Sequence, residues 1–533
     1  MGIYVNPGNE KFMSAIRSKI YVDKTRLLEY TNSVIDTEQR YLCVSRPRRF
    51  GKSIAASMLA AYYSTGCNST DIFDRYLIGN TTDYKQHLNH YPVIHVDLND
   101  FRHRLDFHTG ELISPSDTVR LFHSEIISEL KEYYPDTLGD KDINLPTALA
   151  KIHAKYGDKF IIIIDEWDTI FREDKEDLNA QKLYITLLRG LFKDNNSKQF
   201  LALGYLTGIL PIKKYGTESA LNNFDEFTML RPGMLAEYIG FTEPEVQQLC
   251  RKYHMDFEEA KRWYDGYSFS KISHIYSPNS VVKAMLYGEY SNFWTSTETY
   301  ESLKNYITMN FDGLKSSIIA MLTGEKHKLN PNKFQNDMIS FHAQDDILAL
   351  LIHLGYLAYN AKTQEAYIPN EEVRREFQNA VEETGWDEVV KAIIHSENLL
   401  QSTWEKDEEA IATSLAEIHM NNTSILKYND ENSLACVITL AYYNAMNDYT
   451  IIRELPAGKG FADMVFLPRR HSDKPAMIIE LKYNQSALTA IDQIKEKHYT
   501  NALTDYTGTL LLVGINYNKD TKQHTCKIEE VLL

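Results

Sequence analysis

The sequence predicts an α/β protein with two separate α/β parts, one near each end of the chain, joined by a mainly helical middle. Two observations indicate the first part: an apolar strand leads through Gly51-Lys52-Ser53 into a helix, and a second apolar run ends in Asp165-Glu166. A third observation indicates the second part: a pair of strands near the end carries Asp463 and Glu480-Leu481-Lys482. Strands followed by helices are typical of α/β folds.

The length of the chain implies several domains. At 533 residues it exceeds what one hydrophobic core supports. We expect a first α/β domain at 1–235, a helical lid or winged-helix-like region at 236–385, a solvated helical connector at 386–425 and a second α/β domain at 426–533. A content of 43% hydrophobic and 24% charged residues is that of an ordinary globular protein.

Several classes of protein are excluded by pattern. The longest apolar run, Ile347 to Tyr359, is too short to span a bilayer. The first residues carry neither the basic segment nor the apolar stretch of a secretory signal, so we expect a cytoplasmic protein. The five cysteines form no CxxC pair, which argues against a zinc ribbon or a disulfide framework.

The charge of the chain limits how it meets nucleic acid. A formal net charge of −16 argues against a broadly basic surface, so any contact with nucleic acid must be local. The candidate basic stretches are Arg46 to Lys52, Arg469 to Lys474 and Lys482 to His498.

The stretch around Gly51-Lys52-Ser53 is a candidate nucleotide site. Arg40 to Ser45 reads as a buried strand and Ile54 to Tyr63 as a helix. The amino terminus of a helix presents unpaired N–H groups to a phosphate. Lys52 would then reach the β and γ phosphates and Ser53 would ligate Mg²⁺. The loop residues expected to contact nucleotide are Arg48, Arg49, Phe50, Gly51, Lys52, Ser53 and Ile54.

One residue departs from the usual P-loop pattern. Arg46 stands where the first glycine of GxxxxGK[ST] is expected, and a side chain there restricts the tight turn. The alternative is a surface loop that contains Gly-Lys-Ser by chance.

The acids after the run Phe160 to Ile164 match a Walker B arrangement. A continuous apolar run is typical of a central parallel strand, and this one delivers Asp165 and Glu166 at its carboxyl end. Asp165 would hold Mg²⁺ and Glu166 would polarise the attacking water. A third strand, Phe200 to Leu206, ends at Thr207, a candidate sensor of the γ phosphate. The alternative for Asp165 and Glu166 is an acidic turn after a buried strand, and the alternative for Thr207 is a purely structural role.

The middle of the chain is predicted to be helical. Short amphipathic helices are expected at Glu243 to His254, Asp256 to Tyr264 and Ser277 to Leu286, and helices continue from Ser302 to Thr384. His353 lies on an apolar run and is expected to be a core histidine.

The last part of the chain predicts helix, strand, strand, strand, helix, strand. The helices are Glu431 to Asn444 and Ala487 to Tyr499; the strands are Tyr449 to Leu455, Ala462 to Leu467, Ala476 to Tyr483 and Thr509 to Ile515. This order is that of the restriction-endonuclease-like core.

The hairpin of this part gathers charged residues. If the turn occupies Pro468 to Pro475, Asp463 lies opposite Glu480, with side-chain bases about 5 Å apart on one face. Lys482 shares that face. Two carboxylates so close would repel unless Mg²⁺ or Mn²⁺ lay between them. Asp463 and Glu480 are therefore the expected metal ligands, and Lys482 would stabilise charge on the phosphate.

Further residues of this part are candidates for supporting roles. Glu431 would add a carboxylate, and Gln493 shares a helix face with Lys497 that would meet the phosphate backbone. The alternative for the whole site is a hairpin with an incidental aspartate and a Glu-x-Lys salt bridge.

Several motifs together resemble one family. They are Tyr21-Val22-Asp23-Lys24-Thr25, Ser45 to Ser53, Ile164 to Asp168, Tyr264-Asp265-Gly266-Tyr267 and Tyr276-Ser277-Pro278-Asn279-Ser280. They are similar to motifs of AAA-ATPase-like proteins with a C-terminal PD-(D/E)xK nuclease domain, and the resemblance runs over nearly the whole chain. It implies an α/β P-loop NTPase core, AAA or STAND-like, with a helical lid, plus a C-terminal restriction-endonuclease-like α/β domain. It also implies that Asp463, Glu480 and Lys482 are catalytic, and the family commonly carries arginine at the place of Arg46.

Two functions follow as hypotheses. The first is a cytoplasmic ATPase whose nucleotide state controls a metal-dependent endonuclease, with ATP and Mg²⁺ or Mn²⁺ as cofactors and DNA in preference to RNA as substrate. The second is a nucleotide-dependent switch or scaffold that binds a protein or nucleic-acid partner through a non-cleaving nuclease-like fold. A homo-oligomer in which Arg48 and Arg49 meet a neighbouring subunit's nucleotide is compatible with either.

Overall fold

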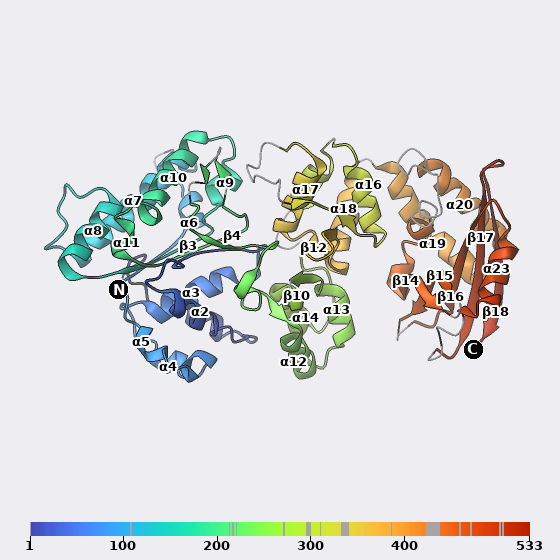
Figure 1. Cartoon of the computed structure of the whole chain (residues 1–533), viewed down its shortest axis with the longest axis horizontal. Helices are drawn as coiled ribbons and strands as arrows, with labels where there is room; N and C mark the ends of the chain where they lie inside the picture. The colour runs from blue at the N-terminus through green and yellow to red at the C-terminus, as the bar shows by residue number, and fades with distance from the viewer. Residues whose placement is uncertain are drawn as a thin grey trace. The chain divides into compact units, whose positions relative to one another are not determined.

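The computed structural model shows two compact units (Figure 1). It describes residues 2–106, 109–212, 214–215, 218–219, 221–269, 272–294, 300–309, 311–331, 341–384, 386–422, 438–457, 460–469, 472–499, 503 and 506–533. The first unit comprises Met1–Thr299 and His327–Glu376, and the second comprises Tyr300–Lys326 and Phe377–Leu533. The four-part division at 235, 385 and 425 stays a prediction.

The first unit contains a five-stranded parallel sheet with the order β2-β3-β4-β1-β7. Its strands are β1 (Tyr41–Ser45), β2 (Val93–Asp97), β3 (Phe160–Asp165), β4 (Leu201–Gly208) and β7 (Asp225–Phe227). β1, β3 and β4 confirm the three predicted strands, and β2 and β7 are additional to the prediction. Because β4 lies between β1 and β3, the carboxyl ends of the three strands meet at one edge of the sheet.

Helices cover both faces of this sheet, which explains why β1, β3 and β4 are buried along their whole length. Figure 1 shows α7, α8 and α10 over one face and α2 and α3 over the other. The helices of this part are α1 (Glu10–Ile16), α2 (Leu27–Val34), α3 (Lys52–Tyr63), α4 (Thr70–Phe73), η1 (Leu77–Asn80), α5 (Tyr84–His87), α6 (Leu98–Arg102), α7 (Pro115–Tyr133), α8 (Leu145–Tyr156), α9 (Thr169–Glu173), α10 (Leu178–Phe192) and α11 (Ser197–Phe200).

A smaller helical module follows within the same unit. The predicted helices are confirmed as α12 (Glu243–Tyr253), α13 (Phe257–Tyr264) and α14 (Pro278–Tyr287), and they surround a sheet of β8 (Phe241–Thr242), β10 (Ile272–Tyr276) and β9 (Tyr267–Phe269). Trp263 and Tyr264 belong to its core. In the sequence, β5 (Lys214–Tyr215) and β6 (Glu218–Ser219) lie between β4 and β7, and η2 (Gly233–Leu235) lies between β7 and β8.

The stretch after this module is not helical throughout, and here the prediction was wrong. The apolar run that begins at Ile347 is a helix, α17 (Gln344–Leu354), only as far as Gly355, which ends the helix with φ +88°. The chain then forms β12 (Ala358–Asn360), which joins β13 (Glu365–Tyr367) and β11 (His327–Lys328) in a small sheet. His353 is buried, as expected, and burial lowers its pKa to about 3.

The second unit is built on a five-stranded sheet in the order β14-β15-β16-β17-β18. Its strands are β14 (Tyr449–Ala457), β15 (Gly460–Pro468), β16 (Ala476–Tyr483), β17 (Thr509–Asn518) and β18 (Gln523–Leu532). The pair β16–β17 is parallel and the other pairs are antiparallel. The predicted strands are confirmed, and β18 is additional to them.

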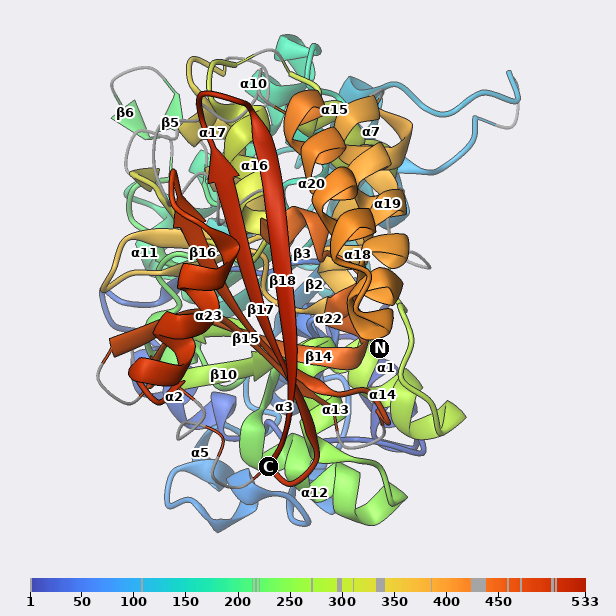
Figure 2. The ribbon, with the colours of Figure 1, turned by 90° about the vertical axis from the view of Figure 1, so that its right-hand side faces the viewer.

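Helices also cover both faces of this second sheet (Figure 2). Ile491 and Ile494 of α23 (Ala487–Glu496) pack on one face, and on the other Tyr442 contacts Phe466 of β15. The unit also contains α15 (Tyr300–Ile307), α16 (Leu314–Leu322), most of α18 (Glu371–Glu383), α19 (Asp387–Glu405), α20 (Glu408–Asn422) and α22 (Ala445–Asp448).

The helices α19 and α20, which fall in the range expected to be a connector, belong to the second compact unit. Their apolar side chains Leu399, Leu400, Ile411 and Leu415 are buried, and α20 packs along β18. Within the described residues, no helix combines the length and the apolar character needed to cross a membrane.

Candidate functional site

The loop between β1 and α3 has the conformation of a phosphate-binding turn. Arg49 and Gly51 both have positive φ, 62° and 94°, which turns the backbone sharply before α3 begins at Lys52. α3 is a twelve-residue helix, so its first N–H groups and its dipole face the loop. The local geometry therefore favours an anion at this place.

The loop borders a pocket of about 810 Å³. The pocket is lined by all seven loop residues that the sequence singled out and by Glu166. Apolar side chains from the N-terminal segment and from the module of α12 to α14 and β8 to β10, here called the lid module, complete the lining. The lining includes Arg48, Arg49, Phe50, Gly51, Lys52, Ser53, Ile54, Ile20, Val22, Phe241 and Val282. A cavity lined by both charged and apolar side chains fits a nucleotide.

Lys52 is buried and is held by its own loop. Its Nζ donates a hydrogen bond to the carbonyl oxygen of Pro47 at 3.0 Å and lies 3.6 Å from Oε1 of Glu166. Glu166 has a positive φ of 50° and also receives a 2.7 Å hydrogen bond from Nη2 of Arg172. Burial alone would raise the pKa of Glu166, but Lys52 and Arg172 lower it overall. Glu166 is thus an ionised carboxylate clamped by two cations.

Asp165 lies at the end of β3, where polar groups surround it. It accepts hydrogen bonds from the hydroxyls of Ser53 and Thr207 and from the backbone N–H of Glu166 at 3.0 Å. Burial, and then the neighbouring Glu166, raise its pKa. Thr207 is fully buried, and neither it nor Asp165 lines the pocket.

Sequence reasoning missed Asp97, a third acid at this edge of the sheet. β2 and β3 run in register with Asp97 beside Asp165, and burial followed by the charge of Asp165 raises the pKa of Asp97 to about 7. The signal was present, because Val93 to Val96 is an apolar run that ends in an acid, as β3 does. His95 interrupts that run and made it less visible.

Arg46 faces away from the pocket, into the protein. It is fully buried, and its Nη1 donates hydrogen bonds of 2.9 Å to the carbonyl oxygens of Ser45 and Phe227. Its guanidinium lies 5.2 Å from the ring centroid of Phe269 in the lid module, and burial lowers its pKa to about 10. Among the residues that the structure describes, Nε and Nη2 have no hydrogen-bond partner. Arg46 therefore anchors the loop on its buried side, away from the pocket.

Two further contacts join the same loop to later segments, one to β9 and one to the end of α17. The ring of Phe50 packs edge-on against that of Tyr267 at 5.4 Å between centroids, and the Tyr267 hydroxyl donates to the carbonyl oxygen of Gly355 at 2.6 Å. A Cβ added at Gly355 would lie 2.6 Å from Cγ of Pro47, so the ring of Pro47 packs directly against the backbone of Gly355.

In the second unit, the register of β15 and β16 is the predicted one. The ladder consists of Phe466↔Met477, Val465↔Ile478 and Met464↔Ile479, and one further pair in the same register would be Asp463 with Glu480. At that point the ladder is replaced by a side-chain contact, because Oδ2 of Asp463 accepts a 2.7 Å hydrogen bond from the N–H of Leu481.

Glu480 and Lys482 are buried beside one another. Nζ of Lys482 lies 3.0 Å from Oε1 of Glu480 and also donates to the carbonyl oxygen of Leu481. Burial first, and then the charge of Asp463, raise the pKa of Glu480 to about 7. The structure therefore brings the three predicted groups together.

Of the supporting residues, Gln493 is also at this site. Its Nε2 donates to Oε1 of Glu480 and, at 3.2 Å, to the hydroxyl of Tyr499. Lys497 follows as the C-cap of α23 and is half-buried. Glu431 lies outside the described residues.

The comparisons with known protein families agree with both candidate sites, the one around Lys52 and the one around Glu480. A family model described as a predicted AAA-ATPase matches residues 8–217, and one described as the PD-(D/E)XK nuclease superfamily matches residues 429–527. The chain joins an AAA-ATPase-like domain to a PD-(D/E)XK nuclease superfamily domain. All the loop and strand residues singled out around Lys52 lie in the AAA-ATPase-like domain, and Asp463, Glu480, Lys482 and Gln493 lie in the nuclease superfamily domain.

Two individual proteins are also similar. An uncharacterized protein encoded in the 5′ region of vnfD in Azotobacter chroococcum mcd 1 is 23% identical over 294 residues, which cover 54% of this chain and 52% of that relative. The match thus spans about half the length of that relative. A structure of the Aeropyrum pernix ORC2 protein in ADPNP and ADP complexes covers 70% of this chain and 94% of its own, at 10% identity and a TM-score of 0.22.

The nuclease superfamily domain offers a donor set that fits a divalent cation. Oε2 of Glu480 is buried and has no hydrogen-bond partner within the described part of the chain, and its carboxylate lies close enough to Asp463 for their charges to interact. An orphaned carboxylate oxygen next to a second carboxylate is the ligand type that Mg²⁺ and Mn²⁺ prefer. Among the described residues, no group of three or more His, Cys, Asp or Glu gathers around one point, so further ligands would be water or backbone oxygens.

Proposed function

We propose that this protein binds and hydrolyses ATP in its AAA-ATPase-like domain and cleaves phosphodiester bonds of DNA in its PD-(D/E)XK nuclease superfamily domain. The observation that carries the proposal is the gathering of Asp463, Glu480 and Lys482 on β15 and β16, with one carboxylate oxygen left without a partner. The pocket beside Lys52 supports the nucleotide half.

The AAA-ATPase-like domain supplies the groups that ATP hydrolysis needs. Lys52 would exchange the carbonyl oxygen of Pro47 for the phosphates, since a phosphate is the stronger acceptor. Ser53 and Asp165, which contact each other, would hold Mg²⁺, which neutralises charge on the β and γ phosphates. Glu166 is ionised and would orient the attacking water once Lys52 has turned to the nucleotide.

The nuclease superfamily domain would act through three side chains. Asp463 and Glu480 would hold the cation, which lowers the pKa of a bound water and neutralises the scissile phosphate. Glu480 must be deprotonated to do so, and Lys482 and Gln493 already stabilise its charged form by hydrogen bonds. Lys482 would then stabilise the negative charge that develops on the phosphate.

Plasmid DNA tests the nuclease half. Purified protein is incubated with supercoiled plasmid and Mg²⁺ or Mn²⁺, with and without ATP, and nicked and linear products are measured on gels. We expect cleavage by the wild type, and loss of at least ~100-fold in rate for Asp463→Asn and Lys482→Ala. Lys519→Ala, an exposed lysine in the turn between β17 and β18 and outside the stretch Lys482 to His498, is the matched control and should cleave normally. Cleavage that is equal in all four proteins would refute the assignment.

A second function is favoured by the hydrogen bonds at Glu480 and by the charge of the chain. Lys482 and Gln493 occupy Oε1 of Glu480, and a net charge of −16 disfavours broad contact with DNA. The protein would then be a nucleotide-dependent switch that binds a partner through a nuclease-like fold without cleaving. ATP binding with negligible turnover, together with partner binding that survives Asp463→Asn, would support this reading.

A further inference from the structure

Asn99 places a side-chain amide at the phosphate end of the nucleotide pocket. It lies in the first turn of α6, directly after β2, and it lines the pocket together with Lys52, Ser53 and Glu166. Sequence reasoning did not single it out, because a lone asparagine after a short strand carries no motif.

Two hydrogen bonds fix the orientation of Asn99. Its backbone N–H donates to Oδ1 of Asp97 at 2.9 Å, so the Asp97 side chain caps α6. Its side-chain Oδ1 accepts a 3.0 Å hydrogen bond from the hydroxyl of Thr169, which is fully buried at the start of α9. A side-chain amide has one acceptor end and one donor end. In this orientation Thr169 contacts the acceptor end of the amide, which leaves the NH₂ group as the end that Thr169 does not use.

The connection to Thr169 also couples Asn99 to Glu166. The Thr169 hydroxyl lies 2.8 Å from the carbonyl oxygen of Glu166, and Nη2 of Arg172 lies 3.4 Å from the same hydroxyl. Asn99 therefore belongs to the network that positions Glu166, although it comes from the adjacent strand.

Thr207, the sensor predicted from the sequence, has a different environment. It is fully buried, its hydroxyl donates to Asp165, and it does not line the pocket. Its donor is already used by the carboxylate expected to hold Mg²⁺. A group that distinguishes ATP from ADP must reach the terminal phosphate, and of these two residues only Asn99 lines the pocket.

We infer that the NH₂ group of Asn99 donates a hydrogen bond to the terminal phosphate of ATP and so lets the site distinguish ATP from ADP. The inference rests on the proposed nucleotide site and adds a residue on β2–α6 to it. Through Thr169, the same contact would hold the Glu166 segment in place when the terminal phosphate is present and release it when the phosphate leaves.

The test compares two nucleotides in five proteins. The dissociation constants of ATPγS and ADP, both with Mg²⁺, are measured by calorimetry, and ATP turnover by phosphate release, for the wild type, Asn99→Asp, Asn99→Ala, Thr207→Val and Asp100→Asn. Asn99→Asp keeps an acceptor for Thr169 but replaces the donor by a negative charge. Asp100→Asn changes an exposed neighbour on α6 that does not line the pocket.

We expect both Asn99 variants to bind ADP within about twofold of the wild type, to bind ATPγS at least ~10-fold more weakly and to turn over ATP ~100-fold more slowly. Asp100→Asn should leave both affinities and the turnover unchanged. The inference would be overturned if both Asn99 variants kept the wild-type ratio of ATPγS affinity to ADP affinity. It would also be overturned if Thr207→Val were the one variant that lost this ratio. If the wild type binds neither nucleotide, the proposed nucleotide site itself fails and the inference fails with it.

Discussion

The ammonium group of Lys52 lies 3.6 Å from the carboxylate of Glu166 and 3.0 Å from the carbonyl oxygen of Pro47. The ammonium group is thereby held within its own loop at the N-terminus of α3. From this position it would contact a phosphate of the proposed nucleotide. This arrangement makes Lys52 the first residue to change.

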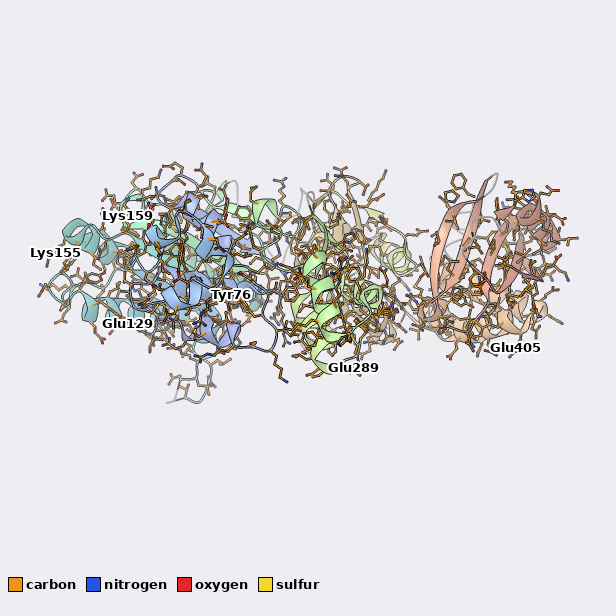
Figure 3. The ribbon with its side chains drawn as sticks, turned by 90° about the horizontal axis from the view of Figure 1, so that it is seen from below. Tyr76, Glu129, Lys155, Lys159, Glu289 and Glu405 are labelled. Atoms are coloured by element: carbon orange, nitrogen blue, oxygen red, sulfur yellow. The ribbon has the colours of Figure 1, made fainter. Side chains whose placement is uncertain are left out.

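Lys52→Met should weaken ATP binding by ~1.5–3 kcal/mol, about 10- to 150-fold, because a charge-assisted hydrogen bond to phosphate is lost. Calorimetric titration with ATP and Mg²⁺ measures the change. Lys155→Met is the control: Lys155 is an exposed lysine on α8 and does not line the pocket (Figure 3). Equal losses in both variants would show that binding does not depend on the loop.

Gly355→Ala should destabilise the first unit more than Gly288→Ala. Both glycines end a helix with positive φ, 88° and 74°, so an alanine strains both backbones by ~1–2 kcal/mol. Only at Gly355 does the new Cβ meet a neighbour, at 2.6 Å from Pro47, which adds ~1–3 kcal/mol of overpacking. Urea unfolding followed by tryptophan fluorescence gives the difference, and equal midpoints would contradict the close contact.

Glu372→Gln should stabilise the protein at high pH. Glu372 is buried on α18, accepts hydrogen bonds from Ser280 and Phe293, and has a pKa raised to about 8, first by burial. Between the unfolded value of about 4.3 and about 8 the folded state holds one more proton than the unfolded state. The free energy of unfolding therefore falls as pH rises through this window.

The amide removes that dependence, so we expect the melting temperature of Glu372→Gln to exceed that of the wild type at pH 8.5 and to match it near pH 4.5. Glu371→Gln is the contrasting control. Burial opposes ionisation of Glu371, but Arg374 and Arg375 lower its pKa overall, so this variant should be less stable than the wild type at pH 8.5. A pH-independent difference between Glu372→Gln and the wild type would be the contrary result.

Divalent cations should stabilise the nuclease superfamily domain through Asp463 and Glu480. After removal of metal with EDTA, addition of Mn²⁺ at ten times its dissociation constant should raise the free energy of unfolding by ~1.4 kcal/mol. Circular dichroism melts measure the shift, which should vanish in Asp463→Asn and Glu480→Gln. Glu496→Gln changes an exposed acid on α23 and should retain the shift. A shift that persists in both site variants would place the cation elsewhere.

Arg46→Gly should destabilise the protein although it restores the usual glycine of the motif. The variant leaves the carbonyl oxygens of Ser45 and Phe227 without their donor and empties a buried volume, at a cost of ~2–4 kcal/mol. Arg46→Met keeps much of the volume and removes a buried charge with two unpartnered nitrogens, so it should cost less. Urea midpoints in the reverse order would contradict the anchoring role.

The sequence predicted the strands whose signal is continuous. Phe160 to Ile164 is unbroken and gave β3, and the register of β15 with β16 followed from the turn between two prolines. The convergence of Asp463, Glu480 and Lys482 is a local consequence of that register, since opposed residues share a face. Local patterns therefore sufficed for the second site.

The residues that the sequence did not predict depend on contacts between distant segments. Asn99 lines the pocket only because β2 lies beside β3 in the sheet, and the local sequence of neither strand shows that the two are neighbours. For the same reason Thr207 was placed in the pocket although the structure buries it against Asp165. The small sheet of β11, β12 and β13 was missed because its strands are two or three residues long.

The packing behind the phosphate loop has a consequence for the thermodynamics of ligand capture. Arg46 bonds to Phe227 and lies against Phe269, and Phe50 packs on Tyr267, so the loop is wedged against segments far away in sequence. A loop shaped in this way loses little conformational entropy when a ligand arrives, because folding has already ordered it. The loop is thus preorganised, and the affinity of a ligand bound there would depend on charge and shape more than on the ordering of a flexible loop.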